Sequence, residues 1–181
     1  MDHTDRQTIQ QCLNGHPEAF RDMVRRYQGV LTAHLAGALG RRQEAEEAAQ
    51  ETFVRAYFGL GRLKEPDRFL AWLLGIADRV AYESARRRTR ERELARVWAE
   101  ARPADEISDD LALEQAVHKL PGPYRDVVLL RYYGQRSCKE VAQDLGVPLG
   151  TVTKQLSRAY ALLRESLDVQ ANRSARSEER S

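Results

Sequence analysis

The sequence has little of what marks a secreted, membrane or metal-binding protein. Its 181 residues include two cysteines, Cys12 and Cys138, which form neither a disulfide framework nor a metal-ligand cluster with the four histidines. No apolar run approaches the length that spans a bilayer, and the N-terminus lacks the basic and apolar segments of an export signal. We therefore expect a cytoplasmic protein that is not inserted in a membrane.

Patterns typical of strands and a strong net charge are also nearly absent. Apolar residues recur at helical spacing almost everywhere, so an all-α fold is predicted. The 29 lysines and arginines nearly balance the 27 aspartates and glutamates, which leaves a formal net charge of +2 and excludes a uniformly basic nucleic-acid coat. A nucleic-acid site must come from local segregation of charge. Arginines gather over 86–92 and glutamates over 44–51, which suggests two different partner surfaces.

The motifs of common enzymes are missing. There is no glycine-rich phosphate loop, no metal-spaced set of histidine and cysteine, and no nucleophile beside an evident base. We therefore expect a protein that is not an enzyme and needs no cofactor.

The helical pattern divides the chain into two small domains joined by a flexible linker. The first domain covers residues 1–92, with helices over 5–13 and 43–58 and a long helix for which Asp67 is a plausible N-cap. The helical pattern weakens over about 91–110, and residues 102–110 are acidic and short of large apolar residues, so 93–110 is expected to be the linker. The second domain covers 111–167. The polar residues 168–181 are predicted to be a disordered tail.

The segment Ser137–Val152 reads as a helix-turn-helix. Ser137 and Glu140 have the spacing of a capping box, and Gly146 supplies the tight turn. Between Ser137 and Gly146 lies an apolar stripe with spacing i, i+3, i+4 and i+7, made of Cys138, Val141, Ala142 and Leu145. On this stripe the thiol of Cys138 is expected to pack in the core and not to act as a redox sensor.

The second helix of this motif has one apolar and one polar face. Its apolar stripe consists of Val152, Leu156, Ala159 and Leu163, which leaves Thr151, Lys154, Gln155 and Arg158 on the opposite face. Such side chains can donate to base edges and phosphates. The alternative is an ordinary solvated helix face. We favour DNA binding because the turn, the cap and the stripe agree.

Two parts of the chain resemble the extracytoplasmic function (ECF) group of bacterial RNA polymerase sigma factors. Segments 120–132 and 146–152 are similar to sigma region 4, and segments 46–57 and 68–77 are similar to region 2. The order and spacing also match, over about residues 18–92 and 111–167. The joint occurrence is far more specific than a helix-turn-helix alone.

The resemblance implies a division of labour between the domains. Region 2 in relatives docks on the β′ clamp helices of core RNA polymerase and opens the −10 element, and region 4 binds the −35 element and the β flap. By this likeness Glu47, Gln50 and Glu51 form the polymerase-binding face, and their spacing places them on one helix surface. The alternative is a solvated acidic face. An anti-sigma factor is a further expected partner.

The resemblance also points to DNA contacts in region 2. The loop 60–65 corresponds to the loop that captures a flipped −10 base, and Lys64 lies within it. Candidates for contact with the −10 DNA or its backbone are Lys64, Arg79, Arg86, Arg87 and Arg88. Two departures from the family pattern affect the expected DNA specificity. Asp78-Arg79 stands where many relatives have Arg-Asn, which affects the −10 preference. Gln155 stands where many have arginine, and glutamine favours adenine whereas arginine favours guanine.

One rival function remains, that of a helix-turn-helix regulator acting outside the polymerase holoenzyme. Such a regulator needs a sensor or dimerisation domain at its N-terminus. Residues 19–92 carry the region 2 likeness instead, which disfavours the rival.

Overall fold

The computed structural model describes residues 5–96 and 109–178, and the described chain is helical without strands. The predicted all-α fold is confirmed. Four helices form the N-terminal half: α1 (Asp5–Leu13), α2 (Phe20–Leu39), α3 (Arg42–Gly59) and α4 (Phe69–Arg96). Four more form the C-terminal half: α5 (Asp109–His118), α6 (Gly122–Val128), α7 (Cys138–Leu145) and α8 (Leu149–Glu178). A π-helical turn, η4 (Leu129–Tyr133), continues α6.

The N-terminal half is built around α2, which packs on both α3 and α4. Met23, Leu31 and Leu35 of α2 are fully buried, as are Phe69 and Leu73 at the start of α4. Burial of one apolar face of each helix stabilises such a bundle at about 25 cal/mol for each Å² of apolar surface removed from water. Gly40 ends α2 in the left-handed conformation (φ 70°), which permits the short connection to α3.

The C-terminal half is a smaller helical unit in which α6 and α7 pack on α8. The four apolar residues predicted on the inner face of the second motif helix, Val152, Leu156, Ala159 and Leu163, are all buried. On α7, by contrast, Val141 is buried and the other three members of the predicted stripe are half-buried.

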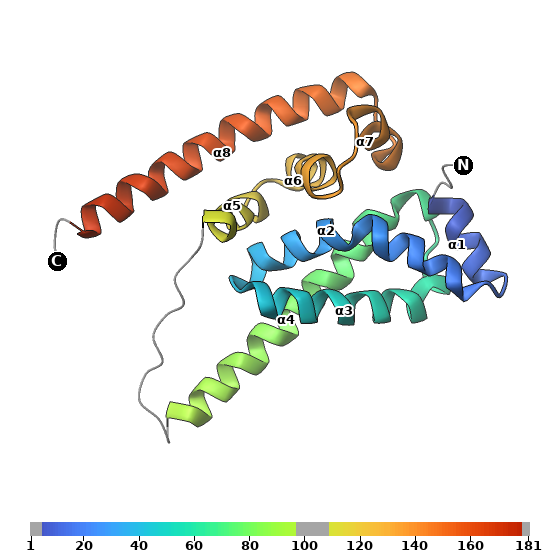
Figure 1. Ribbon diagram of the computed structural model, residues 1–181, viewed down its shortest axis with the longest axis horizontal. Helices are drawn as coiled ribbons and strands as arrows, with labels where there is room; N and C mark the ends of the chain where they lie inside the picture. The colour runs from blue at the N-terminus through green and yellow to red at the C-terminus, as the bar shows by residue number, and fades with distance from the viewer. Residues whose placement is uncertain (1–4, 97–108, 179–181) are drawn as a thin grey trace.

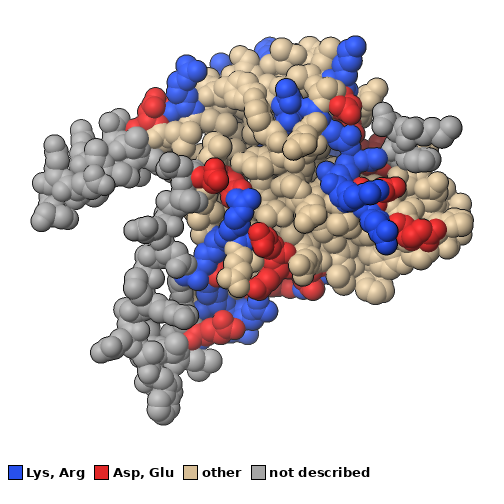
Figure 2. Space-filling model, in the orientation of Figure 1, with Lys and Arg blue, Asp and Glu red and all other residues tan. Residues whose placement is uncertain are grey.

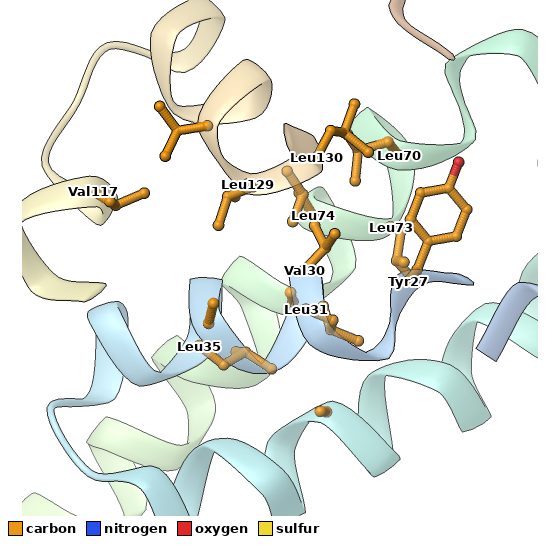
Figure 3. Packing of buried hydrophobic residues seen from close by; sticks show 14 of the residues in the cluster. Tyr27, Val30, Leu31, Leu35, Leu70, Leu73, Leu74, Val117, Leu129 and Leu130 are labelled. Atoms are coloured by element: carbon orange, nitrogen blue, oxygen red, sulfur yellow. The ribbon is translucent and has the colours of Figure 1, made fainter. Parts of the chain in front are cut away.

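The two halves lie against each other in the structure. Helix α5 and the π-helical turn η4 cover one side of α2, and α8 lies on the outside of the C-terminal half (Figure 1). Their buried apolar residues form one continuous cluster. Figure 3 shows Val117, Leu129 and Leu130 of the C-terminal half facing α2 and α4 residues that include Val30 and Leu74.

Three details differ from the sequence prediction. Asp67 does not cap the long helix: it lies in a 3-10 turn, Pro66–Arg68, and its carboxylate accepts a hydrogen bond from Arg6 Nη2 at 2.6 Å. Helix α8 continues to Glu178, so most of the predicted disordered tail 168–181 is helical, because no glycine or proline follows to stop the helix. The predicted linker 93–110 lies mostly outside the described residues, and α4 extends into it as far as Arg96.

Among the described residues, none of the helices combines the length and the apolar character that crossing a bilayer requires.

Candidate nucleic-acid and polymerase interfaces

The helix-turn-helix of α7 and α8 has the caps that the sequence predicts. The Oγ atom of Ser137 accepts the backbone N–H of Glu140 at 3.3 Å, and the carboxylate of Glu140 accepts the N–H of Ser137 at 2.8 Å. Hydrogen bonds from Ser137 hold the pKa of Glu140 below its usual value. Gly146 is left-handed (φ 64°) and its N–H reaches the carbonyl of Ala142, which ends α7 at the turn.

The four predicted recognition residues share the outer side of the first turns of α8. Lys154 and Arg158 are exposed, whereas Thr151 and Gln155 are half-buried. The Oε1 atom of Gln155 is buried and has no hydrogen-bond partner among the described residues. A buried polar atom without a partner is costly.

A groove runs between these residues and the start of α6. Pro121, Pro123 and Tyr124 form its second wall, opposite the four recognition residues. These three residues belong to the segment that resembles the family, and they were not predicted to lie at a DNA surface. They precede the recognition helix by about thirty residues, so no local pattern could show that they lie beside it. The packing of α6 on α8 brings them there.

The predicted polymerase-binding residues are neighbours on α3 but line two different hollows. Glu47, Gln50 and Glu51 are all exposed on α3. Glu47 and Glu51 line a groove between α3 and α4, whereas Gln50 lines a separate hollow beside α2. The side chain of Glu51 accepts a hydrogen bond at 2.7 Å from Arg55, which also bridges to Glu83 on α4 at 2.7 Å.

The arginine cluster at the outer part of α4 is partly consumed by internal contacts. Arg88 Nη1 lies 3.0 Å from a carboxylate oxygen of Glu44 and 3.3 Å from the backbone carbonyl of Leu39, so it fastens α4 to the end of α2. Arg87 lies 4.0 Å from Glu91. Basic and acidic side chains are mixed over this part of the surface (Figure 2).

The remaining predicted contacts in region 2 are exposed but scattered. Lys64 and Arg79 are exposed, on the loop before α4 and on α4 itself, and Arg86 is exposed farther along α4. The loop 60–65 begins with a 3-10 turn, Leu60–Arg62, anchored by the buried Leu60. The buried Leu60 therefore fixes the start of the loop that carries the exposed Lys64.

Asp78, a departure from the family pattern, has an internal partner. Its Oδ1 atom lies 2.7 Å from Nε2 of His34, which is buried on α2. This contact holds the pKa of Asp78 below its usual value. The partners are 44 positions apart, so the sequence alone gave no sign of the pair.

Metal chemistry finds no support in this geometry: within 5–96 and 109–178, histidine, cysteine, aspartate and glutamate side chains form no group of three or more that could hold an ion.

The fold and these surfaces define an all-helical protein with a capped helix-turn-helix in its C-terminal half, after an N-terminal helical bundle. Residues 23–91 match the family model of sigma-70 region 2, and residues 110–163 match that of sigma-70 region 4. The ECF RNA polymerase sigma factor SigW of Bacillus subtilis is 30% identical over 176 residues, covering 88% of this chain and 94% of its own. The chain belongs to the ECF RNA polymerase sigma factors.

Other relatives span the chain equally well. The RNA polymerase sigma-H factor of Pseudomonas aeruginosa is 28% identical, covering 91% of this chain and 92% of its own. A solved structure of CnrH in complex with the cytosolic domain of CnrY is 30% identical, with a TM-score of 0.48, and covers 92% of this chain and 99% of that one. The two family models and the relative from Bacillus subtilis confirm the predicted family, and sigma factors are transcription initiation factors.

Proposed function

We propose that this protein is the subunit that confers promoter specificity on core RNA polymerase. The observation that carries the proposal is the occurrence of regions 2 and 4, in that order, on one chain whose region 4 folds as a capped helix-turn-helix. A regulator acting outside the holoenzyme has no use for region 2, which occupies residues 23–91.

Region 4 is assigned the −35 element. Lys154 and Arg158 are exposed on the outer side of α8 and can neutralise phosphates, since phosphate contacts need positive charge more than exact geometry. The partly buried Gln155 can bridge an adenine edge through its amide. A base that satisfies its unpaired Oε1 atom would contribute to specificity. The β flap of polymerase is the family's protein partner for this region.

Region 2 is assigned the docking on the β′ clamp helices and the −10 element. Glu47 and Glu51, on the groove between α3 and α4, form the main part of the proposed docking surface, and Gln50 extends it toward α2. For the −10 DNA, the exposed Lys64, Arg79 and Arg86 are better candidates than Arg88, whose guanidinium already has two internal partners. An anti-sigma factor, as in other members of the family, is the proposed regulatory partner.

In vitro transcription with purified core polymerase on a library of promoter fragments tests the proposal. We expect specific transcripts when the protein and core are present together and none with either alone. Specific promoter footprints by the free protein, combined with no change in polymerase activity, would favour a regulator outside the holoenzyme.

The matched control is a variant changed only on the recognition helix. Lys154→Ala with Arg158→Ala should still assemble with core, because both side chains lie on α8 and away from α3, but should lose promoter-specific transcripts. Assembly and promoter recognition are then read separately.

A further inference from the structure

One face of α2 carries three small residues at i, i+4 and i+8: Gly29, Ala33 and Gly37. The C-terminal half approaches the backbone there. A Cβ atom at Gly37 would lie 2.3 Å from the carbonyl oxygen of Glu114 and 2.6 Å from Cβ of His118, and one at Gly29 would lie 2.5 Å from the carbonyl oxygen of Tyr133. Real Cβ atoms do not come this close to backbone atoms, so only glycine permits the contact at both points.

Glycine has a cost at these positions. In the interior of a helix it is destabilising relative to alanine, because it loses more backbone freedom on folding. The N-terminal half has no need of glycine at either position for its own packing, since the atoms that would collide belong to the C-terminal half. Gly75 on α4 gives the contrast: a Cβ atom there meets nothing within 4 Å.

Polar contacts cross the same boundary. Nη1 of Arg42 on α3 lies 3.3 Å from the carboxylate of Glu114 on α5, and the Glu114 side chain is only 3% exposed. The buried ring of His34 lies between Asp78 of its own half and His118, whose ring centre is 5.0 Å away. Groups buried in this way are stabilised only while their partners are in place.

Apolar contacts complete the boundary. Leu129 and Leu130 on η4 are fully buried, and Figure 3 shows them facing α2 and α4. Separation of the halves would expose these leucines to water, which the hydrophobic effect opposes.

We infer that the Gly29–Ala33–Gly37 face of α2 is a docking surface for this protein's own C-terminal half, which holds the free protein in a closed form. Close backbone approach, the Arg42–Glu114 ion pair and the buried leucines act together there. Glycine at positions 29 and 37 of α2 thus permits the close approach of the C-terminal half.

In the closed form, residues of the C-terminal half lie next to both proposed surfaces of region 2, the polymerase-docking surface and the −10 DNA surface. Glu114 and Tyr133 line the same hollow as Gln50, beside the proposed polymerase face. Helix α7 also packs on the turn Pro66–Arg68, which directly follows the loop 60–65. Polymerase must therefore displace the C-terminal half before it docks, a consequence that rests on the proposed function.

Small-angle X-ray scattering on the full chain tests the closed form without polymerase. The double variant Gly29→Ala/Gly37→Ala should have a larger radius of gyration than the unmodified protein, and circular dichroism should show undiminished helix content. The control Gly75→Ala changes the same residue type within a helix of the same half and should leave the radius of gyration unchanged. Arg42→Ala, which changes an exposed side chain and removes the partner of the Glu114 carboxylate, should give a smaller shift in the same direction.

An unmodified protein that is already extended, or a folded double variant as compact as the Gly75→Ala control, would overturn the docking surface. Stopped-flow binding to core polymerase tests the inhibitory role separately. The opened double variant should associate several times faster than the unmodified protein; an equal rate would overturn that role. If no variant binds core at all, the proposed function fails while the scattering result still decides the closed form.

Discussion

In the N-terminal half, helices α2, α3 and α4 enclose most of the buried apolar residues, whereas the C-terminal half relies on a surface outside itself. Met23, Leu31 and Phe69 are buried among N-terminal helices, but Leu129 and Leu130 become buried against α2 and α4. The comparison shows that the C-terminal half leaves the polar face of its recognition helix exposed to solvent, while the apolar residues on its other side are buried only by contact with the N-terminal half.

The halves also use positive charge differently. In the N-terminal half, Arg55 and Arg88 are held between helices by carboxylates, so much of the cationic charge serves packing. On the recognition helix, Lys154 and Arg158 are exposed and lie along a groove that can admit a ligand. A run of arginines in the sequence is therefore weaker evidence for a phosphate site than two well-placed side chains on one helix face.

The largest effect is expected from charge reversal in the N-terminal half. Glu47→Lys should weaken binding to core polymerase by about a hundredfold or more and abolish transcription, because like charges placed at an interface cost several kcal/mol. Glu47 is exposed, so the helical fold should persist in circular dichroism. The matched control Glu165→Lys makes the same charge change at an exposed position of α8 and should assemble as the unmodified protein does. Equal core affinity for both variants would remove Glu47 from the docking surface.

The next largest effect is expected on the recognition helix. Gln155→Arg should shift the preferred −35 bases from adenine toward guanine, with a discrimination of about tenfold, because an arginine bidentate to guanine is worth about 1–3 kcal/mol. Binding profiles of holoenzyme on a randomised −35 library measure this directly. Identical profiles for variant and unmodified protein would show that Gln155 does not read bases.

A pair of smaller effects should separate the two uses of arginine. Arg158→Ala should lower the salt dependence of holoenzyme binding to DNA by roughly one phosphate contact, a slope change of about 0.9, without changing thermal stability. Arg88→Ala should leave that slope unchanged and reduce the free energy of unfolding by about 1 kcal/mol, since it loses Glu44 and a backbone carbonyl. A lower salt slope for Arg88→Ala with unchanged stability would instead show that Arg88 contacts DNA.

Local features of the fold were predictable from the sequence, and contacts between distant segments were not. The capping box at Ser137, the turn at Gly146 and the bounds of α1 follow from short-range rules of capping and periodicity, and the structure confirms them. The Asp67 cap was wrong because Pro66 starts a separate 3-10 turn before α4. A local rule could not distinguish these two ways of entering a helix.

The residues of the candidate sites stay predictions, and their arrangement depends on how the helices pack. The sequence placed Glu47, Gln50 and Glu51 together because helical spacing makes them neighbours, yet neighbouring helices divide them between two hollows. Pairs such as Arg88 with Glu44 and His34 with Asp78 join residues 44 positions apart. Such pairs depend on how the helices pack, which periodicity does not specify.

The smallest effect concerns pH and the contact between the halves. Burial, together with the positive charge of Arg125, holds the pKa of His118 below its ordinary value of 6.5. The groups facing it are His34 from α2, Asp78 from α4, Arg125 from α6 and the adjacent Lys119. In the open form His118 regains its ordinary pKa. The closed form thus has the full contribution of neutral His118 above about pH 6.5 and loses it as the pH falls further.

Three carboxyl groups act in the opposite direction. Burial raises the pKa of Glu114 and of Asp126, and it raises that of Asp144 to about 6, so protonation of these groups at low pH favours the packed form. A difference measurement isolates the histidine. As the pH falls below about 6.5, the radius of gyration of the unmodified protein should rise more steeply than that of His118→Gln, because glutamine cannot take up the proton. Parallel curves for the two proteins would show that His118 does not link protonation to opening.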